Sequence, residues 1–181
     1  KNYGEEAGAT LEHPHSQLIA LPIVPRELAT EMDGAKFHFS YRERCIFCDI
    51  LRQEMDEGER VVSVSQEFVA FEPFASRFPF ETWIVPRNHA AYFENISDAQ
   101  LDDLSAIFCD IFRRLDRTLG DVPYNFYLHS APADGERLAD SFHWHFEITP
   151  IQTRIAGFEK GAGFFINPVP PEEAATFLRG V

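Results

Sequence analysis

Long apolar runs are missing from this sequence. No segment of its 181 residues approaches the roughly 18 to 20 consecutive apolar residues that a membrane-spanning helix needs. The first ten residues, KNYGEEAGAT, contain neither the apolar core nor the cleavage site of a secretory signal. Apolar residues nevertheless make up 45% of the chain and include 18 Phe, enough for one substantial core. We therefore expect a globular, cytoplasmic protein that does not enter a membrane.

Basic residues are scarce relative to acidic ones. The chain has 16 Lys and Arg against 29 Asp and Glu, which gives a net charge of −13. Nonspecific binding to nucleic acid depends on clustered Lys and Arg. The charge therefore argues against a nucleic-acid-binding protein, although a small anionic substrate could still be held by a few local groups.

Cysteine is also rare. There are three cysteines, an odd number, and two of them form the motif CIFC at Cys45 and Cys48. Without an export signal, a disulfide framework is disfavoured, and metal binding or redox chemistry is favoured. The third, Cys109, lies in an apolar helical pattern and is predicted to be a core thiol.

The hydrophobic pattern predicts helices packed on antiparallel strands. Ser97 followed by Gln100 is typical of a helix start, and Gly120 of its end. Further helices are expected over 26–44, 46–58 and 170–180, with a glycine-rich turn around 156–165. Strands are expected over 15–24, 60–65, 68–74, 81–86, 124–130 and 141–150.

Two His-x-His motifs precede apolar strands that end in proline. They are His13 with His15, and His143 with His145, in HPHSQLIALP and HWHFEITP. Residues two apart in a strand face the same way, so each pair is expected to project together. One such pair could consist of ordinary strand histidines. Two similar motifs, however, suggest that the chain contains the end of one repeat followed by a complete second repeat.

These residue types favour two kinds of chemistry. A C-x-x-C motif with distant histidines is typical of a zinc site, and no thioredoxin-like βαβ pattern supports the redox alternative. A neutral histidine can act as a nucleophile toward phosphorus. The Gln17 amide, two residues after His15, could bind charged oxygens of the transition state, or it could be a plain surface amide.

The motifs together resemble those of a known family. NYGEEAGATLEHPHSQLIALP is similar to the active-site segment of the galactose-1-phosphate uridylyltransferase family, the transferase branch of the histidine-triad superfamily. The resemblance continues through CIFC, PRNH, YLHSAP, FHWHFEI and AGFEKGAGFFINP and so covers nearly the whole chain. The sequence of the last motif is more similar to that of the related ADP-glucose phosphorylases.

The resemblance implies roles for individual residues. His15 would carry the nucleotide, Gln17 would bind its phosphate, and His13 would be a metal ligand of the first repeat, whose other ligands would lie upstream of this chain. Asn2 and Ser16 would contact the substrate. In family dimers, the loop that contains Phe158 and Glu159 reaches the active site of the partner, so a homodimer is expected.

Two alternative metal sites follow from the same resemblance. The sulfur set comprises Cys45, Cys48, His89 and His143, and the carboxylate set used by other family members comprises Glu31, His129, His143 and His145. We favour zinc in the sulfur set, because zinc prefers thiolate ligands and a closed four-ligand site suits a structural role. Iron in the carboxylate set is the alternative.

The sequence thus leads to one overall hypothesis. The fold is expected to be α+β, a histidine-triad-like antiparallel sheet with packed helices, in which residues 1–25 end a first repeat and residues 26–181 form a second. The expected activity is nucleotidyl transfer between a nucleotide sugar and a sugar 1-phosphate, with UDP-glucose:hexose-1-phosphate uridylyl transfer favoured. ADP-glucose:phosphate adenylyl transfer is the first alternative, and a non-catalytic, zinc-stabilised module is the second.

Overall fold

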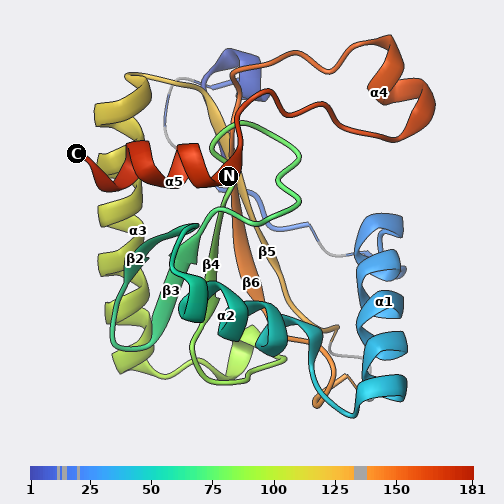
Figure 1. Ribbon diagram of the computed structural model, residues 1–181. Helices are drawn as coiled ribbons and strands as arrows, with labels where there is room; N and C mark the ends of the chain where they lie inside the picture. The colour runs from blue at the N-terminus through green and yellow to red at the C-terminus, as the bar shows by residue number, and fades with distance from the viewer. Residues whose placement is uncertain (12, 14–15, 20, 133–137) are drawn as a thin grey trace.

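The protein is built on a six-stranded antiparallel sheet. The computed structural model describes residues 1–11, 13, 16–19, 21–132 and 138–181 (Figure 1). The strand order is β1-β5-β6-β4-β3-β2, and every neighbouring pair is antiparallel. The strands are β1 (Asn2–Tyr3), β2 (Val61–Val64), β3 (Phe68–Phe71), β4 (Thr82–Pro86), β5 (Tyr124–His129) and β6 (His145–Pro150). The expected α+β fold is confirmed.

Helices cover both faces of the sheet. On one face, α3 (Asp98–Leu119) and α5 (Pro171–Arg179) pack against the main core. On the other, α2 (Ile46–Glu57) packs on the strands, and α1 (Arg26–Arg42) packs beside α2 (Figure 1). Short helices complete the fold: η1 (Glu5–Ala7), η2 (Phe93–Asn95) and α4 (Gly157–Ala162).

The start and the buried face of α3 follow directly from its sequence. The Ser97 side chain accepts a hydrogen bond from the Gln100 amide, and the Gln100 side chain accepts one from the Ser97 amide. The buried residues of this helix recur every three or four positions: Leu104, Ile107, Ile111 and Leu115. Cys109 lies off this stripe and is exposed, so the prediction of a core thiol is wrong.

Strand alternation separates apolar from polar side chains on β6. Ile148 belongs to the core beneath α3 and α5, and Phe146 packs against that core. His145, Glu147 and Thr149 alternate with them and therefore face the side covered by α1 and α2. The sheet thus presents buried polar groups to those two helices.

Two expected elements differ from the structure. Described residues 16–19 and 21–25 form no strand, and Leu18 is fully exposed, because no neighbouring strand lies alongside to accept their hydrogen bonds. The expected glycine-rich turn contains one short helix, α4, which Gly163 ends with a positive φ of 71°. No helix in the described parts of the chain is long and apolar enough to cross a membrane.

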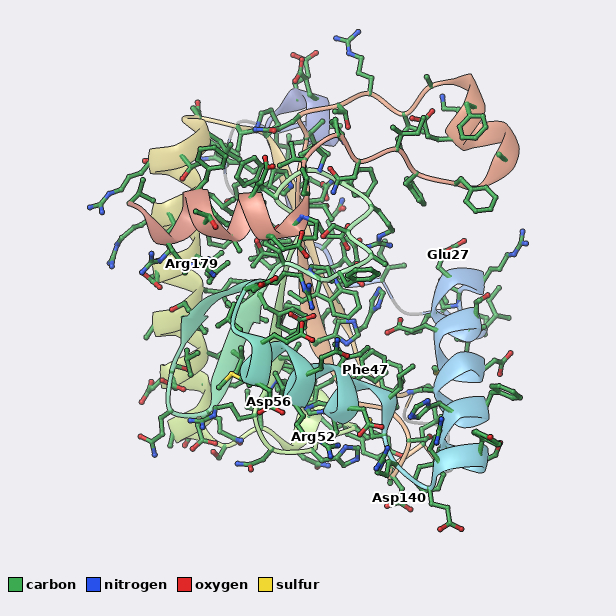
Figure 2. The ribbon with its side chains drawn as sticks, viewed as in Figure 1. Glu27, Phe47, Arg52, Asp56, Asp140 and Arg179 are labelled. Carbon is green, nitrogen blue, oxygen red and sulfur yellow. The ribbon has the colours of Figure 1, made fainter. Side chains whose placement is uncertain are left out.

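The outer strand β2 is tied to the C-terminal helix. Figure 2 labels Arg179, which lies at the end of α5. One of its guanidinium nitrogens donates to the carbonyls of Gly58, Glu59 and Val61. Because an edge strand offers unpaired backbone groups to other chains, these contacts help to close that edge.

Glu72, directly after β3, is a carboxyl group fully buried on the core side of the sheet. Its Oε1 accepts a hydrogen bond of 2.7 Å from the Thr82 hydroxyl, whereas Oε2 has no partner among the described residues. Burial raises the pKa of Glu72 well above its usual range, and the nearby Glu81 carboxylate adds to this effect. The folded state therefore favours the neutral acid.

This burial predicts a pH-dependent effect of Glu72→Gln. Wild-type folding should lose stability as the pH rises from the unfolded pKa of about 4.3 toward the raised folded pKa, at up to ~1.4 kcal/mol per pH unit. An amide does not ionise, so the difference between the Tm of the variant and the Tm of the wild type should increase in favour of the variant from pH 4.5 to pH 8. A Tm difference that stays constant over this range would show that Glu72 is not held neutral.

Candidate metal and nucleotide site

The first part of the candidate site is formed at the start of α2. Cys45 is the N-cap residue, with extended backbone dihedrals, and Cys48 lies one turn later. This spacing brings both thiols to the same end of the helix. Cys45 is buried and Cys48 is partly buried.

Two histidines from distant segments meet these thiols. His89 follows β4, and His143 lies just before β6. Cys48 Sγ is 3.3 Å from His89 Nδ1 and 3.5 Å from His143 Nδ1. One ligand atom from each of the four residues lies within 4.8 Å of the others. The structure therefore brings the predicted sulfur set together.

Hydrogen bonding orients the His89 ring for metal binding. Its Nε2 lies 2.6 Å from the Ala139 carbonyl oxygen, which can only accept, so Nε2 carries the proton. Nδ1 then presents its lone pair to the thiols, as a backbone carbonyl commonly arranges for metal-binding histidines. A hydrogen bond from the neighbouring Cys48 thiol is the largest cause that lowers the pKa of the Cys45 thiol, and it outweighs the opposing effect of burial, which favours a thiolate at Cys45. Two sulfurs and two ring nitrogens fit a tetrahedral metal ion.

A second group of potential ligands lies on the same face of the sheet. Glu31 of α1 approaches His129, at the end of β5, and His145, at the start of β6. The Glu31 carboxylate is 2.7 Å from His129 Nδ1 and 3.4 Å from His145 Nε2. His129 and His145 are direct partners in the β5–β6 register.

The second group differs from the predicted carboxylate set in one residue. Glu31, His129 and His145 converge, but His143 joins the cysteines instead. Both histidines of HWH face the side of α1 and α2 as expected, yet they serve different groups. His145 Nδ1 is 3.1 Å from the His143 carbonyl oxygen, which leaves its Nε2 directed at Glu31. The two metal sets therefore share no residue.

Residues that sequence reasoning missed surround this second group. Glu147 Oε1 lies 3.6 Å from His145 Nε2, and Arg77 pairs with the Glu147 carboxylate. Burial raises the pKa of Glu147, but the His145 ring and the Arg77 guanidinium outweigh it and lower the pKa to about 2. Trp83 stacks on His145 with ring centroids 4.7 Å apart.

A small cavity opens beside this group. Its volume is ≈ 300 Å³, and its lining includes Glu27 of α1 and Phe47 of α2, which Figure 2 marks on these helices. In the sequence, Glu147 stands two residues after His145, just as Gln17 stands two residues after His15. That spacing is the one sequence feature that could have pointed to Glu147.

The N-terminal segment encloses a separate cavity of ≈ 730 Å³. Asn2, Gly4, Gly8 and His13 contribute to its lining. Gly4 has a φ of 81°, and a Cβ there would come within 2.8 Å of the Pro123 side chain, so this turn requires glycine. A backbone that curls around a cavity in this way can approach a phosphate closely.

The other predicted substrate-site residues belong to two segments, 15–17 and α4. His15 falls outside the described residues, and Ser16 and Gln17 are exposed. Phe158 and Glu159 belong to α4, where the Glu159 carboxylate accepts a hydrogen bond from the Ala156 amide. Phe158 is exposed.

Comparison with known proteins is consistent with this arrangement. Residues 31–168 match the family model described as galactose-1-phosphate uridyl transferase, C-terminal domain. The whole chain is 36% identical to half of the ADP-glucose phosphorylase of Arabidopsis thaliana. It is 31% identical, over 99% of the chain and 58% of the relative, to the galactose-1-phosphate uridylyltransferase of Thermotoga maritima.

Solved structures of related proteins have the same fold as this chain. A crystal structure of an Arabidopsis thaliana ADP-glucose phosphorylase with bound ADP-glucose superposes with a TM-score of 0.91 at 34% identity, over 100% of this chain and 57% of that one. A zinc-bound histidine triad family protein from Mycobacterium smegmatis shares the fold, with a TM-score of 0.51 at 16% identity over 75% of this chain and 91% of that one. The chain spans about half the length of its curated relatives, and it belongs to the galactose-1-phosphate uridyl transferase family, of which it matches the C-terminal domain.

Proposed function

We propose that the whole protein transfers a nucleoside monophosphate between a nucleotide sugar and a sugar 1-phosphate or phosphate. The observation that carries this proposal is the family match together with the HPHSQ motif, whose first residue, His13, lines a cavity with Gly4 and Gly8. The neutral ring of His15 would attack the α-phosphorus. A P–N bond forms as the P–O bond to the leaving sugar 1-phosphate breaks, and an incoming phosphate group then reverses the step.

Side chains around His15 would bind the substrate. The Gln17 amide would donate to a phosphoryl oxygen, and Asn2 and Ser16 would hold the nucleotide. Phe158 and Glu159, on α4, would contact the sugar in the active site of a partner subunit, as the family resemblance implies. The homodimer is part of this proposal.

Two nucleotides are candidates. Several relatives are named as uridylyltransferases, and the 36% identical relative is named as an ADP-glucose phosphorylase, which would correspond to adenylyl transfer in this proposal. The motif AGFEKGAGFFINP favours the second, because Phe165 stands near the place where uridylyltransferases have Gln. Turnover of UDP-glucose and ADP-glucose, compared on the intact protein, would distinguish them.

We further propose that Cys45, Cys48, His89 and His143 hold zinc. The donor set and the ring orientation of His89 support this proposal. Closed four-ligand zinc sites stabilise folds, so the metal would join the start of α2 to the ends of two strands. His13 would bind a metal in the first repeat, with its other ligands supplied from outside this chain.

The zinc proposal predicts a specific effect of Cys45→Ser. Zinc content should fall from about one ion for this site to near zero, and a loss of a few kcal/mol of folding free energy should lower the Tm by about 10 °C. Elemental analysis and thermal unfolding would measure both. Cys109→Ser is the matched control, since Cys109 is exposed and lies outside both ligand groups. Equal zinc content in the two variants would exclude Cys45 as a ligand.

The covalent mechanism predicts labelling of His15. The intact protein, incubated with a nucleotide sugar labelled in the α-phosphate, should retain acid-labile label that sugar 1-phosphate or phosphate discharges. His15→Gly should abolish labelling and turnover, whereas His13→Ala should mainly reduce metal retention and stability. Undiminished labelling in His15→Gly would contradict the proposed role of His15.

A further inference from the structure

Residues 151–168, which lie between β6 and α5, extend away from the body of the protein and carry α4 (Figure 1). Several of its apolar side chains are exposed, among them Phe158, Phe164 and Ile166. A segment with so few buried contacts needs anchors at its ends to hold a defined position.

Asn167 provides such an anchor at the C-terminal end of the segment. Its side-chain nitrogen donates to the carbonyls of Ser76 and Phe78, at 3.3 and 3.2 Å. Its side-chain oxygen accepts a hydrogen bond of 3.0 Å from the Val169 amide. The single amide group thus joins the segment to the loop between β3 and β4 and also fixes the start of the chain into α5.

The β3–β4 loop is itself held in place by Glu81. Its buried carboxylate accepts hydrogen bonds from the backbone amides of Arg77 and Phe78 and from the Trp83 ring nitrogen. The Arg77 guanidinium also pairs with it. The two carbonyls that Asn167 contacts therefore belong to a loop that is fixed from within.

Two further features connect the same loop and segment. The rings of Phe78 and Phe165 meet edge to face, with centroids 5.2 Å apart. A cavity of ≈ 890 Å³ is lined by Phe78 of the loop, by segment residues that include Ile155 and Lys160, and by sheet residues such as Tyr127. Asn167, which donates to the Phe78 carbonyl, thus joins the loop and the segment that both contribute to this lining.

We propose that Asn167 is a positioning residue, which sets where α4 presents Phe158 and Glu159 to the substrate. This inference rests on the proposed function for the role of α4, but the anchor itself does not. Only a side chain with both a donor and an acceptor satisfies all three backbone groups. An aspartate of the same shape would place an oxygen opposite two carbonyl oxygens.

The test is Asn167→Asp, measured by backbone hydrogen exchange. Loss of two hydrogen bonds should speed exchange of the amides in 156–169, including the Val169 amide, by about tenfold or more. Asn95→Asp, at an exposed residue of η2, adds the same charge and should leave this exchange unchanged. Equal exchange in the two variants would overturn the anchor. Asn167→Ala, which removes all three side-chain hydrogen bonds without adding a charge, should speed exchange in the same segment and tests the anchor if Asn167→Asp does not fold.

Kinetics of the intact protein test the positioning role separately. Asn167→Asp should raise the KM for the sugar substrate by about tenfold and change kcat less, since the reacting groups near His15 are untouched. Faster exchange with an unchanged KM would reduce Asn167 to a structural residue. Absence of nucleotidyl transfer in the parent protein would count against the proposed function, while the exchange result would still decide the anchor.

Discussion

The pairing of β5 with β6 is the constraint on which the rest of the structure depends. In this antiparallel pair, side chains alternate between the two faces, and His129 stands directly opposite His145. Phe126 and Ile148 therefore enter the core beneath α3, while both histidines and Glu147 turn to the other face. Buried polar groups need partners, and Glu31 of α1 and Arg77 of the β3–β4 loop supply them.

The strand pairing explains why His143 and His145, only two residues apart, contact different groups. His143 lies just before the strand and reaches the thiols at the start of α2, whereas His145 lies within it and faces Glu31 on α1. The first group offers sulfur and nitrogen donors, which suit zinc, and the second offers nitrogen and oxygen donors. Because the groups share no residue, occupation of one does not take a ligand from the other.

Much of the fold and the two thiols of the sulfur set could be predicted because their signals were local, whereas His89 and His143 were expected from the family resemblance. The spacing of Ser97 and Gln100 predicts a helix start, and C-x-x-C brings two thiols together within one helical turn. The apolar run at 15–24 has the pattern of a strand, but residues 16–19 and 21–24 have no partner strand in the described part of the chain. Cys109 was misassigned because its neighbours are apolar, although its own direction on α3 is outward.

Other parts of the site depend on long-range packing that no local pattern shows. Arg77 reaches Glu147 across 70 residues of sequence, and Trp83 covers His145 from a neighbouring strand. Asn167 meets carbonyls about 90 residues away. Each of these residues is ordinary in composition, and only the register of the sheet and the course of the β3–β4 loop place it beside its partner.

We propose that zinc in this domain is held by Cys45, Cys48, His89 and His143, and not by Glu31, His129 and His145. X-ray absorption at the zinc edge, measured on the metal-loaded protein, tests this claim most directly. The sulfur set predicts two sulfur neighbours at about 2.3 Å and two nitrogen neighbours at about 2.0 Å. A zinc environment made only of nitrogen and oxygen would contradict the account and would place the metal with Glu31, His129 and His145.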